Sequence, residues 1–224
     1  MDLSYIQPLI THMQAQENKE RAEKMAAYMK DHFSFLGIPA PERTAIFREF
    51  LKEYGKPTME ELPETVRTLW VMPEREYQYC ALAFLEKALR QLTPEHLPLL
   101  EDIALSKSWW DTIDLIASKL MGQILMKYPD ERAVWVSRWD QSDNMWLNRI
   151  AILFQLKYKE KTDVHLLKSI ILHHSEQKEF FIQKAIGWAL REYAKTNPSF
   201  VLQFVEQHSL PSLSKREAVK NLLK

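Results

Sequence analysis

Cysteine and glycine are scarce in this chain of 224 residues, and their scarcity excludes several kinds of protein. Because Cys80 is the single cysteine, the chain can form neither an internal disulfide framework nor a cysteine-based zinc site, and we expect a reducing compartment. Only 4 residues are glycine, which argues against a sheet protein rich in tight turns. No apolar run reaches the roughly 18–20 residues that cross a bilayer, so we expect no membrane partner.

Signals for export and for cofactors are also lacking. The first residues have neither the basic head nor the apolar stretch of a signal peptide, so we expect a cytoplasmic protein. No Gly-rich phosphate loop occurs, and the seven histidines include no HExxH motif and no pair spaced i, i+4. His173 and His174 stand near the expected end of a helix, where we expect them to face solvent and compensate the helix dipole. We therefore expect no metal and no other cofactor.

Net charge is zero, with 30 basic and 30 acidic residues, but the charge is unevenly distributed. Residues 1–140 carry 17 Lys+Arg and 22 Asp+Glu, a balance of −5, whereas residues 141–224 carry 13 and 8, a balance of +5. Such a split indicates that one face could meet a polyanion.

Helical periodicity runs through nearly the whole sequence and predicts an all-α protein. From about residue 58 the expected helices form pairs of roughly 35–45 residues, the length scale of HEAT-type repeats. No long linker divides the chain, so residues 1–224 are interpreted as a single domain. A superhelical solenoid of antiparallel helix pairs would offer a concave surface to an extended partner. A globular helical bundle is the alternative that periodicity does not exclude.

The expected helix at 108–128 carries two tryptophans and two carboxylates at its start. Its core stripe consists of Trp109, Ile113, Ile116, Leu120 and Ile124. Trp110 and Asp114 lie one turn apart at the margin of that stripe and share a face. Asp111 points elsewhere and favours the helix dipole, and Ser108 is expected to be the N-cap in a capping-box arrangement with Asp111. The simplest alternative for the Trp110 and Asp114 pair is a half-buried aromatic beside an exposed acid.

A basic stripe is predicted on the helix at 178–195, opposite its apolar face. Lys184, Arg191 and Lys195 surround Trp188, and cations interleaved with an aromatic ring suit a nucleic-acid backbone. The alternative is a second packing face that buries Trp188 against a neighbouring helix.

The stretch at 142–161 is apolar on almost every side, yet it contains Arg149. A guanidinium in such surroundings needs an anionic partner, either an internal carboxylate or a phosphate. Lys157 and Lys159 lie nearby and add positive charge.

These stretches are similar to the AlkD-type alkylpurine DNA glycosylases, a family of DNA alkylation repair enzymes with HEAT-like repeats. The resemblance covers essentially the whole chain, although Thr44 stands where many members have a second arginine. It rests on five segments: HFSFLGIPAPER (32–43), SWWDTIDLIASKLMG (108–122), SDNMWLNRIAILFQLKYK (142–159), KEFFIQKAIGWALREYAKTNP (178–198) and LSKREAVKNLL (213–223).

The resemblance implies a monofunctional glycosylase that hydrolyses the N-glycosidic bond of N3- or N7-alkylated purines in duplex DNA, and therefore an enzyme of the nucleoid in a bacterium. Asp114, Trp110 and Trp188 match the catalytic positions, with Asp114 stabilising the cationic sugar and positioning water. The DNA contacts that we expect are Arg149, Lys157, Lys184, Arg191, Lys195 and Tyr28. One duplex should fill one concave face, so a monomer is expected. A non-catalytic protein that binds deformed or branched DNA, which would be expected to lack the Trp-x-x-x-Asp pair, and a protein-interaction scaffold remain as alternatives.

Overall fold

The computed structural model describes residues 4–222, so both ends of the predicted domain 1–224 lie outside the described residues. Within that range every regular element is a helix, and there is no strand apart from an isolated bridge between Ser34 and Glu74. This confirms the all-α prediction. The chain forms two compact units, Met1–Gln91 and Leu92–Lys224. That these units make one domain stays a prediction.

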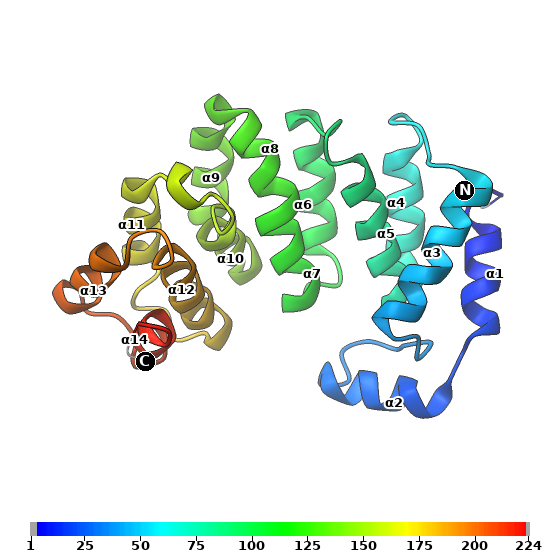
Figure 1. The fold of residues 1–224 in the computed structure, drawn as a ribbon, viewed down its shortest axis with the longest axis horizontal. Helices are drawn as coiled ribbons and strands as arrows, with labels where there is room; N and C mark the ends of the chain where they lie inside the picture. Colours follow the sequence, from blue (N-terminus) through cyan, green and yellow to red (C-terminus); the bar gives the residue numbers. More distant parts are fainter. Residues whose placement is uncertain (1–3, 223–224) are drawn as a thin grey trace. The chain divides into compact units, whose positions relative to one another are not determined.

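The first unit contains five α-helices, labelled in Figure 1. They are α1 (Gln7–Ala15), α2 (Lys19–Tyr28), α3 (Ala40–Tyr54), α4 (Leu62–Val71) and α5 (Arg75–Ala88). Helix α1 packs on α3, and α4 packs on α5 through a short connection, as expected for helix pairs. Leu9, Leu69 and Leu85 are fully buried in this core, whereas α2 has no buried residue.

A buried carboxylate of α5 fixes the loop before α3, which is where the stretch HFSFLGIPAPER begins. Glu76 is fully buried and accepts hydrogen bonds from the backbone N–H groups of Leu36, Gly37 and Ile38 at 2.9–3.1 Å. Gly37 has φ +84°, and a Cβ there would lie 2.1 Å from the carbonyl oxygen of Asn18. Packing within the first unit therefore explains the glycine in this stretch, because only glycine can lie so close to the Asn18 carbonyl with a positive φ.

The second unit holds the remaining helices and all the residues of the predicted catalytic site. They are α6 (Leu97–Leu105), α7 (Trp110–Leu115), a π-helical segment (Ile116–Met121), α8 (Gly122–Lys127), α9 (Arg132–Asp140), α10 (Met145–Leu153), α11 (Val164–His173), α12 (Phe180–Tyr193), α13 (Pro198–Gln207) and α14 (Ser212–Val219). Helix α10 contacts α6, α7, α9, α11 and α12, and every residue from 147 to 153 is buried. Its central position explains why its sequence is apolar on almost every side.

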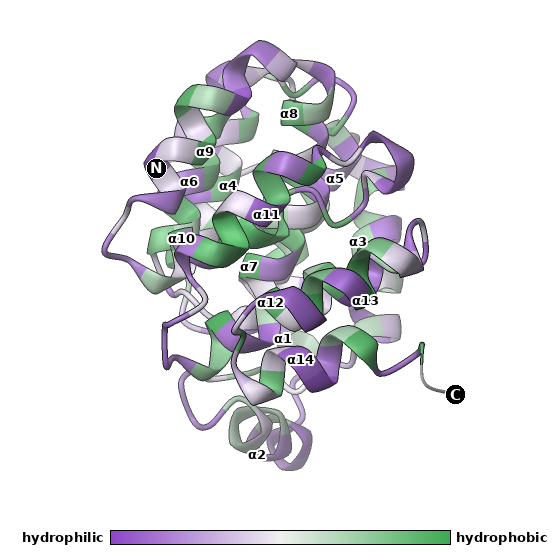
Figure 2. Ribbon diagram, turned by 90° about the vertical axis from the view of Figure 1, so that its left-hand side faces the viewer, coloured by the Kyte–Doolittle hydropathy of each residue, from purple (hydrophilic) through white to green (hydrophobic). Residues whose placement is uncertain are grey.

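Helices α12 and α13 are amphipathic, and both green and purple stretches are visible on them in Figure 2. Among residues 4–222 no helix combines the length and apolar character that a membrane span requires. The described part of the chain is an all-α helical-repeat fold.

Candidate active site

The helix that carries Asp114 starts later than the sequence predicts. Trp109 is the N-cap, with extended φ −159° and ψ 160°, and α7 begins at Trp110. The prediction of Ser108 as N-cap in a capping box is wrong. The Ser108 hydroxyl instead donates a 2.6 Å hydrogen bond to the carbonyl of Ala104, which satisfies the end of α6 rather than the start of α7.

The later start also moves Trp109 out of the predicted core stripe. Ile113, Ile116, Leu120 and Ile124 are buried as predicted, but Trp109 is half-buried and lies before the helix. Its ring meets Phe181 edge-to-face at 5.0 Å and lies 5.8 Å from Trp146. Trp146 and Phe181 are 5.1 Å apart, so the three rings form one aromatic cluster. The sequence did not reveal this cluster because its rings come from three separate segments.

The π-helical segment Ile116–Met121 begins two residues after Asp114, where α7 ends at Leu115. The Ser118 hydroxyl donates to the carbonyl of Asp114 at 2.7 Å, and the segment ends where Gly122 begins α8. A Cβ on Gly122 would lie 2.2 Å from the carbonyl oxygen of Phe154, and the Tyr158 hydroxyl donates to the Gly122 carbonyl at 2.6 Å. Single π turns inside helices are frequent at functional sites. This one shapes the backbone immediately after the candidate catalytic carboxylate.

Asp114 and Arg149 form a bidentate ion pair between α7 and α10. Arg149 Nε lies 2.8 Å from Asp114 Oδ1, and Nη2 lies 2.9 Å from Oδ2. The Arg149 side chain is only 5% exposed and the Asp114 side chain 19%. A third guanidinium nitrogen, Nη1, donates to the carbonyl of Phe181, whose ring centroid lies 5.9 Å from the guanidinium carbon. Of the two partners predicted for Arg149, the structure contains the internal carboxylate.

The structure contradicts the alternative in which Asp114 is an exposed acid, because its side chain is largely buried in the ion pair. Burial raises the pKa of Asp114 above its usual value, and the nearby Asp111 carboxylate acts in the same direction. The hydrogen bonds and the positive charge of Arg149 oppose that rise. Arg149 therefore favours the ionised form of a carboxylate that its surroundings would otherwise neutralise.

Trp110 and Trp188 are both half-buried, on α7 and α12. Trp110 is one turn before Asp114, so both side chains share the face of α7 that meets Arg149. Trp188 follows Phe181 by seven residues, which corresponds to about 10 Å along the same face of α12. Since Phe181 contacts both Arg149 and Trp109, this face of α12 belongs to the same side of the unit as the ion pair.

The predicted basic stripe of α12 is partly neutralised by α14. Glu217 accepts hydrogen bonds from Lys184 at 3.0 Å and from Arg191. The Lys184 hydrogen bond and the Arg191 charge lower the pKa of Glu217. A Cβ on Gly187 would lie 2.9 Å from the carbonyl oxygen of Ser214 on α14. Lys184 and Arg191 thus contact α14, whereas Trp188 stays half-buried.

Two further predicted DNA contacts are well exposed in the second unit. Lys195 keeps 62% of its side chain exposed and pairs with Glu192 at 2.7 Å, one turn earlier on α12. Lys157 is exposed in the connection after α10. These two lysines offer more accessible positive charge than Lys184 and Arg191, which share one carboxylate.

Tyr28 is the one predicted contact in the first unit. It is 70% exposed at the end of α2 and borders an open hollow of about 210 Å³. The hollow is lined by Lys24, Met25, Tyr28, Met29, Phe35 and Tyr79. An exposed aromatic ring beside apolar side chains and a lysine can contact a sugar or a phosphate.

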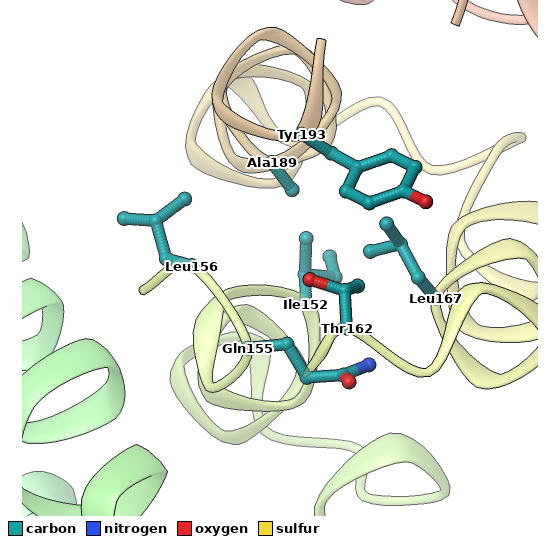
Figure 3. A pocket seen from close by; sticks show the side chains of 7 residues that line it. All are labelled: Ile152, Gln155, Leu156, Thr162, Leu167, Ala189 and Tyr193. Atoms are coloured by element: carbon teal, nitrogen blue, oxygen red, sulfur yellow. The ribbon is translucent and has the colours of Figure 1, made fainter. Parts of the chain in front are cut away.

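A small cavity of the second unit is unsuited to a purine. Its volume is about 10 Å³, near the minimum for a single water molecule. Figure 3 shows Ile152, Leu167 and Tyr193 converging on it from α10, α11 and α12. The candidate active site is therefore the surface around Asp114 rather than this cavity.

Among the described residues, one cluster has the donor set for a metal ion, and it lies on helices other than α7. Asp140 and the adjacent histidines His173 and His174 bring their ligand atoms within 4.8 Å of one another. The prediction that both histidines face solvent is wrong for His174, which is only 1% exposed. The reason is that its ring turns inward to bond Asp140.

Two comparisons with known proteins each match nearly the whole chain. The family described as DNA alkylation repair enzyme matches residues 9–222. A solved structure, a predicted DNA alkylation repair enzyme from Enterococcus faecalis, is 38% identical, with a TM-score of 0.87. The match covers 93% of this chain and 98% of that protein. No curated protein matches the chain.

Proposed function

The chain belongs to the family of DNA alkylation repair enzymes, and from that membership we propose that it is a monofunctional DNA glycosylase. Its substrates would be N3- and N7-alkylated purines in duplex DNA, and its reaction the hydrolysis of the N-glycosidic bond that starts base excision. The observation that carries the proposal is the Asp114–Arg149 ion pair, in which Arg149 favours the charged form of a carboxylate in a partly buried aromatic site.

The chemistry of the lesion matches a site built around one carboxylate. A purine alkylated at N3 or N7 is already cationic, so it leaves readily and needs little acid catalysis. Positive charge then develops on the deoxyribose, where an ionised Asp114 would stabilise it. Each Asp114 oxygen accepts one hydrogen bond from Arg149 and retains capacity for another. One oxygen can therefore also orient or deprotonate the attacking water.

The other predicted residues take supporting roles in this proposal. Trp110 and Trp188 would face the cationic sugar, and each cation–π contact contributes about 0.5–2 kcal/mol. Arg149 would position Asp114 and favour its ionised form. Three of its guanidinium nitrogens already donate to Asp114 and to the Phe181 carbonyl, so its role is within the protein. None of the four residues assigned to the reacting sugar or to Asp114 itself (Asp114, Trp110, Trp188 and Arg149) is an amine that could form a Schiff base, so strand cleavage is not expected.

The DNA backbone would be held by positive charge around this site. Within the predicted set Lys157 and Lys195 are exposed, whereas Lys184 and Arg191 are half-buried. We propose that these four cations of the second unit contact one duplex, that Tyr28 is a DNA contact of the first unit, and that the protein acts as a monomer. The residues would contact phosphates and position the lesion without reading sequence.

Release of methylated bases tests the activity directly. Incubation of methylated duplex DNA with the protein should liberate 7-methylguanine or 3-methyladenine and leave abasic sites in an intact strand, measured by chromatography and by gel. DNA binding without any base release would contradict the glycosylase proposal and favour a non-catalytic protein for deformed or branched DNA. Absence of DNA binding would favour a protein-interaction scaffold.

The basic stripe gives a separate prediction about binding. Replacing Lys184 and Lys195 together by alanine should weaken DNA binding, because two cations near the backbone are lost. The slope of log K against log salt should become shallower by about 0.9 for each phosphate contact removed. Fluorescence anisotropy over a salt series measures it.

The matched control for charge is Lys168→Ala on α11, which removes a lysine from a different helix of the same unit. Its slope should equal that of the unmodified protein. An unchanged slope in the double variant would mean that the stripe contacts protein and solvent only.

A further inference from the structure

Asp140, His173 and His174 form a three-residue cluster at the ends of α9 and α11, apart from the residues assigned to glycosylase chemistry. His173 Nδ1 lies 2.9 Å from Asp140 Oδ2, and His174 Nε2 lies 2.9 Å from Asp140 Oδ1. Two imidazoles and one carboxylate are a common donor set for zinc and other first-row divalent ions. We propose that this cluster binds one divalent transition-metal ion of the zinc class, with water completing the coordination.

The three ligand atoms lie close enough to meet around one ion. With metal–ligand distances near 2.0–2.1 Å, tetrahedral ligands lie roughly 3.3 Å apart. The two nitrogen–oxygen distances of 2.9 Å involve different oxygens of Asp140, so each pair must open by a few tenths of an ångström. The ligand atoms of the three residues lie within 4.8 Å of one another, so the histidine nitrogens must approach each other by up to about 1.5 Å.

The protein holds two of the three ligands firmly and leaves the third accessible. The Asn148 amide donates to the carbonyls of Trp139 at 3.0 Å and Ser142 at 2.8 Å, which fixes the turn that carries Asp140. His174 is buried, and its backbone N–H donates to Ile170. His173 keeps 52% of its side chain exposed, so an ion can enter from its side.

Gln177 supplies the outer support that metal-binding histidines usually have. Its side-chain amide lies 2.9 Å from His174 Nδ1, the nitrogen that faces away from Asp140. With the amide nitrogen there, Nδ1 accepts and Nε2 carries the proton that bonds Asp140. With the amide flipped, its oxygen accepts from Nδ1–H, and Nε2 presents a lone pair to the ion. The same side chain therefore suits both forms of the cluster.

Local electrostatics also favour a cation at this place. Helix α9 ends at Asp140 and α11 ends at His173, and the C-terminal end of a helix carries partial negative charge.

Titration of the chelator-treated full chain with Co²⁺ at neutral pH tests the site. Visible absorption of four- or five-coordinate Co²⁺ should saturate at one ion per chain and disappear on addition of Zn²⁺. Gln177→Ala should weaken binding by about 10- to 100-fold, the usual cost of losing an outer hydrogen bond. His173→Gln removes an exposed ligand and should weaken it by at least as much.

The control is His165→Gln, the same substitution at an exposed histidine of α11 outside the cluster. It should bind Co²⁺ as the unmodified chain does. Zn²⁺ should raise the Tm of the unmodified chain and of the control but not of His173→Gln, because only a folded-state ligand stabilises. Absence of saturable binding, or equal binding by the two glutamine variants, would overturn the proposal and leave the cluster as a hydrogen-bonded bridge between helices.

Discussion

Asp114→Asn is expected to lower the rate of base release by about 100- to 10,000-fold, the usual contribution of a group that handles the reacting proton or charge. The substitution keeps the shape of the side chain and one acceptor oxygen for Arg149, but it removes the negative charge that would face the cationic sugar. The rate should be measured in single turnover on methylated duplex DNA, with DNA affinity measured in parallel. Affinity should change little, because the carboxylate does not neutralise phosphate.

A matched control is available one turn earlier on the same helix. Asp111→Asn removes the same charge from the first turn of α7 without touching the ion pair, so it should retain nearly full activity. Comparable activity in Asp114→Asn and in the unmodified protein would remove Asp114 from the mechanism while leaving the enzyme proposal standing. Equal losses in the two variants would mean that net charge, rather than the position of Asp114, controls the rate.

Much of this site could be predicted from helix periodicity because it depends on spacing within single helices. A period of 3.6 residues separates Trp110 and Asp114 from the buried stripe that contains Ile113 and Ile116, and the structure buries those isoleucines completely. The same reasoning identified Arg149 as a cation that needs an anionic partner, and the structure supplies that partner in Asp114.

The parts that the sequence did not reveal all depend on contacts between distant segments. Glu217 neutralises cations from another helix, and nothing near it in the sequence announces that role. Asp140 meets His173 and His174 across more than thirty residues, so no ligand spacing could be read. The π-helical segment arises where Gly122 packs against the Phe154 carbonyl, which is again a tertiary contact.

Arg149→Met should shift the pH dependence of base release to higher pH. In the proposed mechanism catalysis requires the ionised carboxylate, so the rate should rise with pH as Asp114 loses its proton and then level off. Burial raises the pKa of Asp114 while Arg149 lowers it, and methionine keeps the burial but removes the lowering. An adjacent opposite charge typically moves a carboxyl pKa by about 1–3 units, so the profile should move upward by a similar amount.

Stability should change along with the rate. Removing one partner of a buried ion pair costs about 3–5 kcal/mol, which urea unfolding can measure. The sign of its pH dependence follows from the raised pKa of Asp114. The folded variant holds that proton more tightly than the unfolded chain, so its stability should fall as pH rises through the pKa of the folded state and return as pH is lowered.

Arg149→Lys separates charge from geometry in this prediction. Lysine keeps the positive charge beside Asp114 but loses the planar fork that bonds both carboxylate oxygens. Its pH profile should stay close to that of the unmodified protein, with reduced stability, whereas Arg149→Met should lose rate at neutral pH and recover part of it as pH increases. A rate in Arg149→Met that is depressed equally at every pH would mean that Arg149 serves only to hold the helices together, and that the charge of Asp114 does not depend on it.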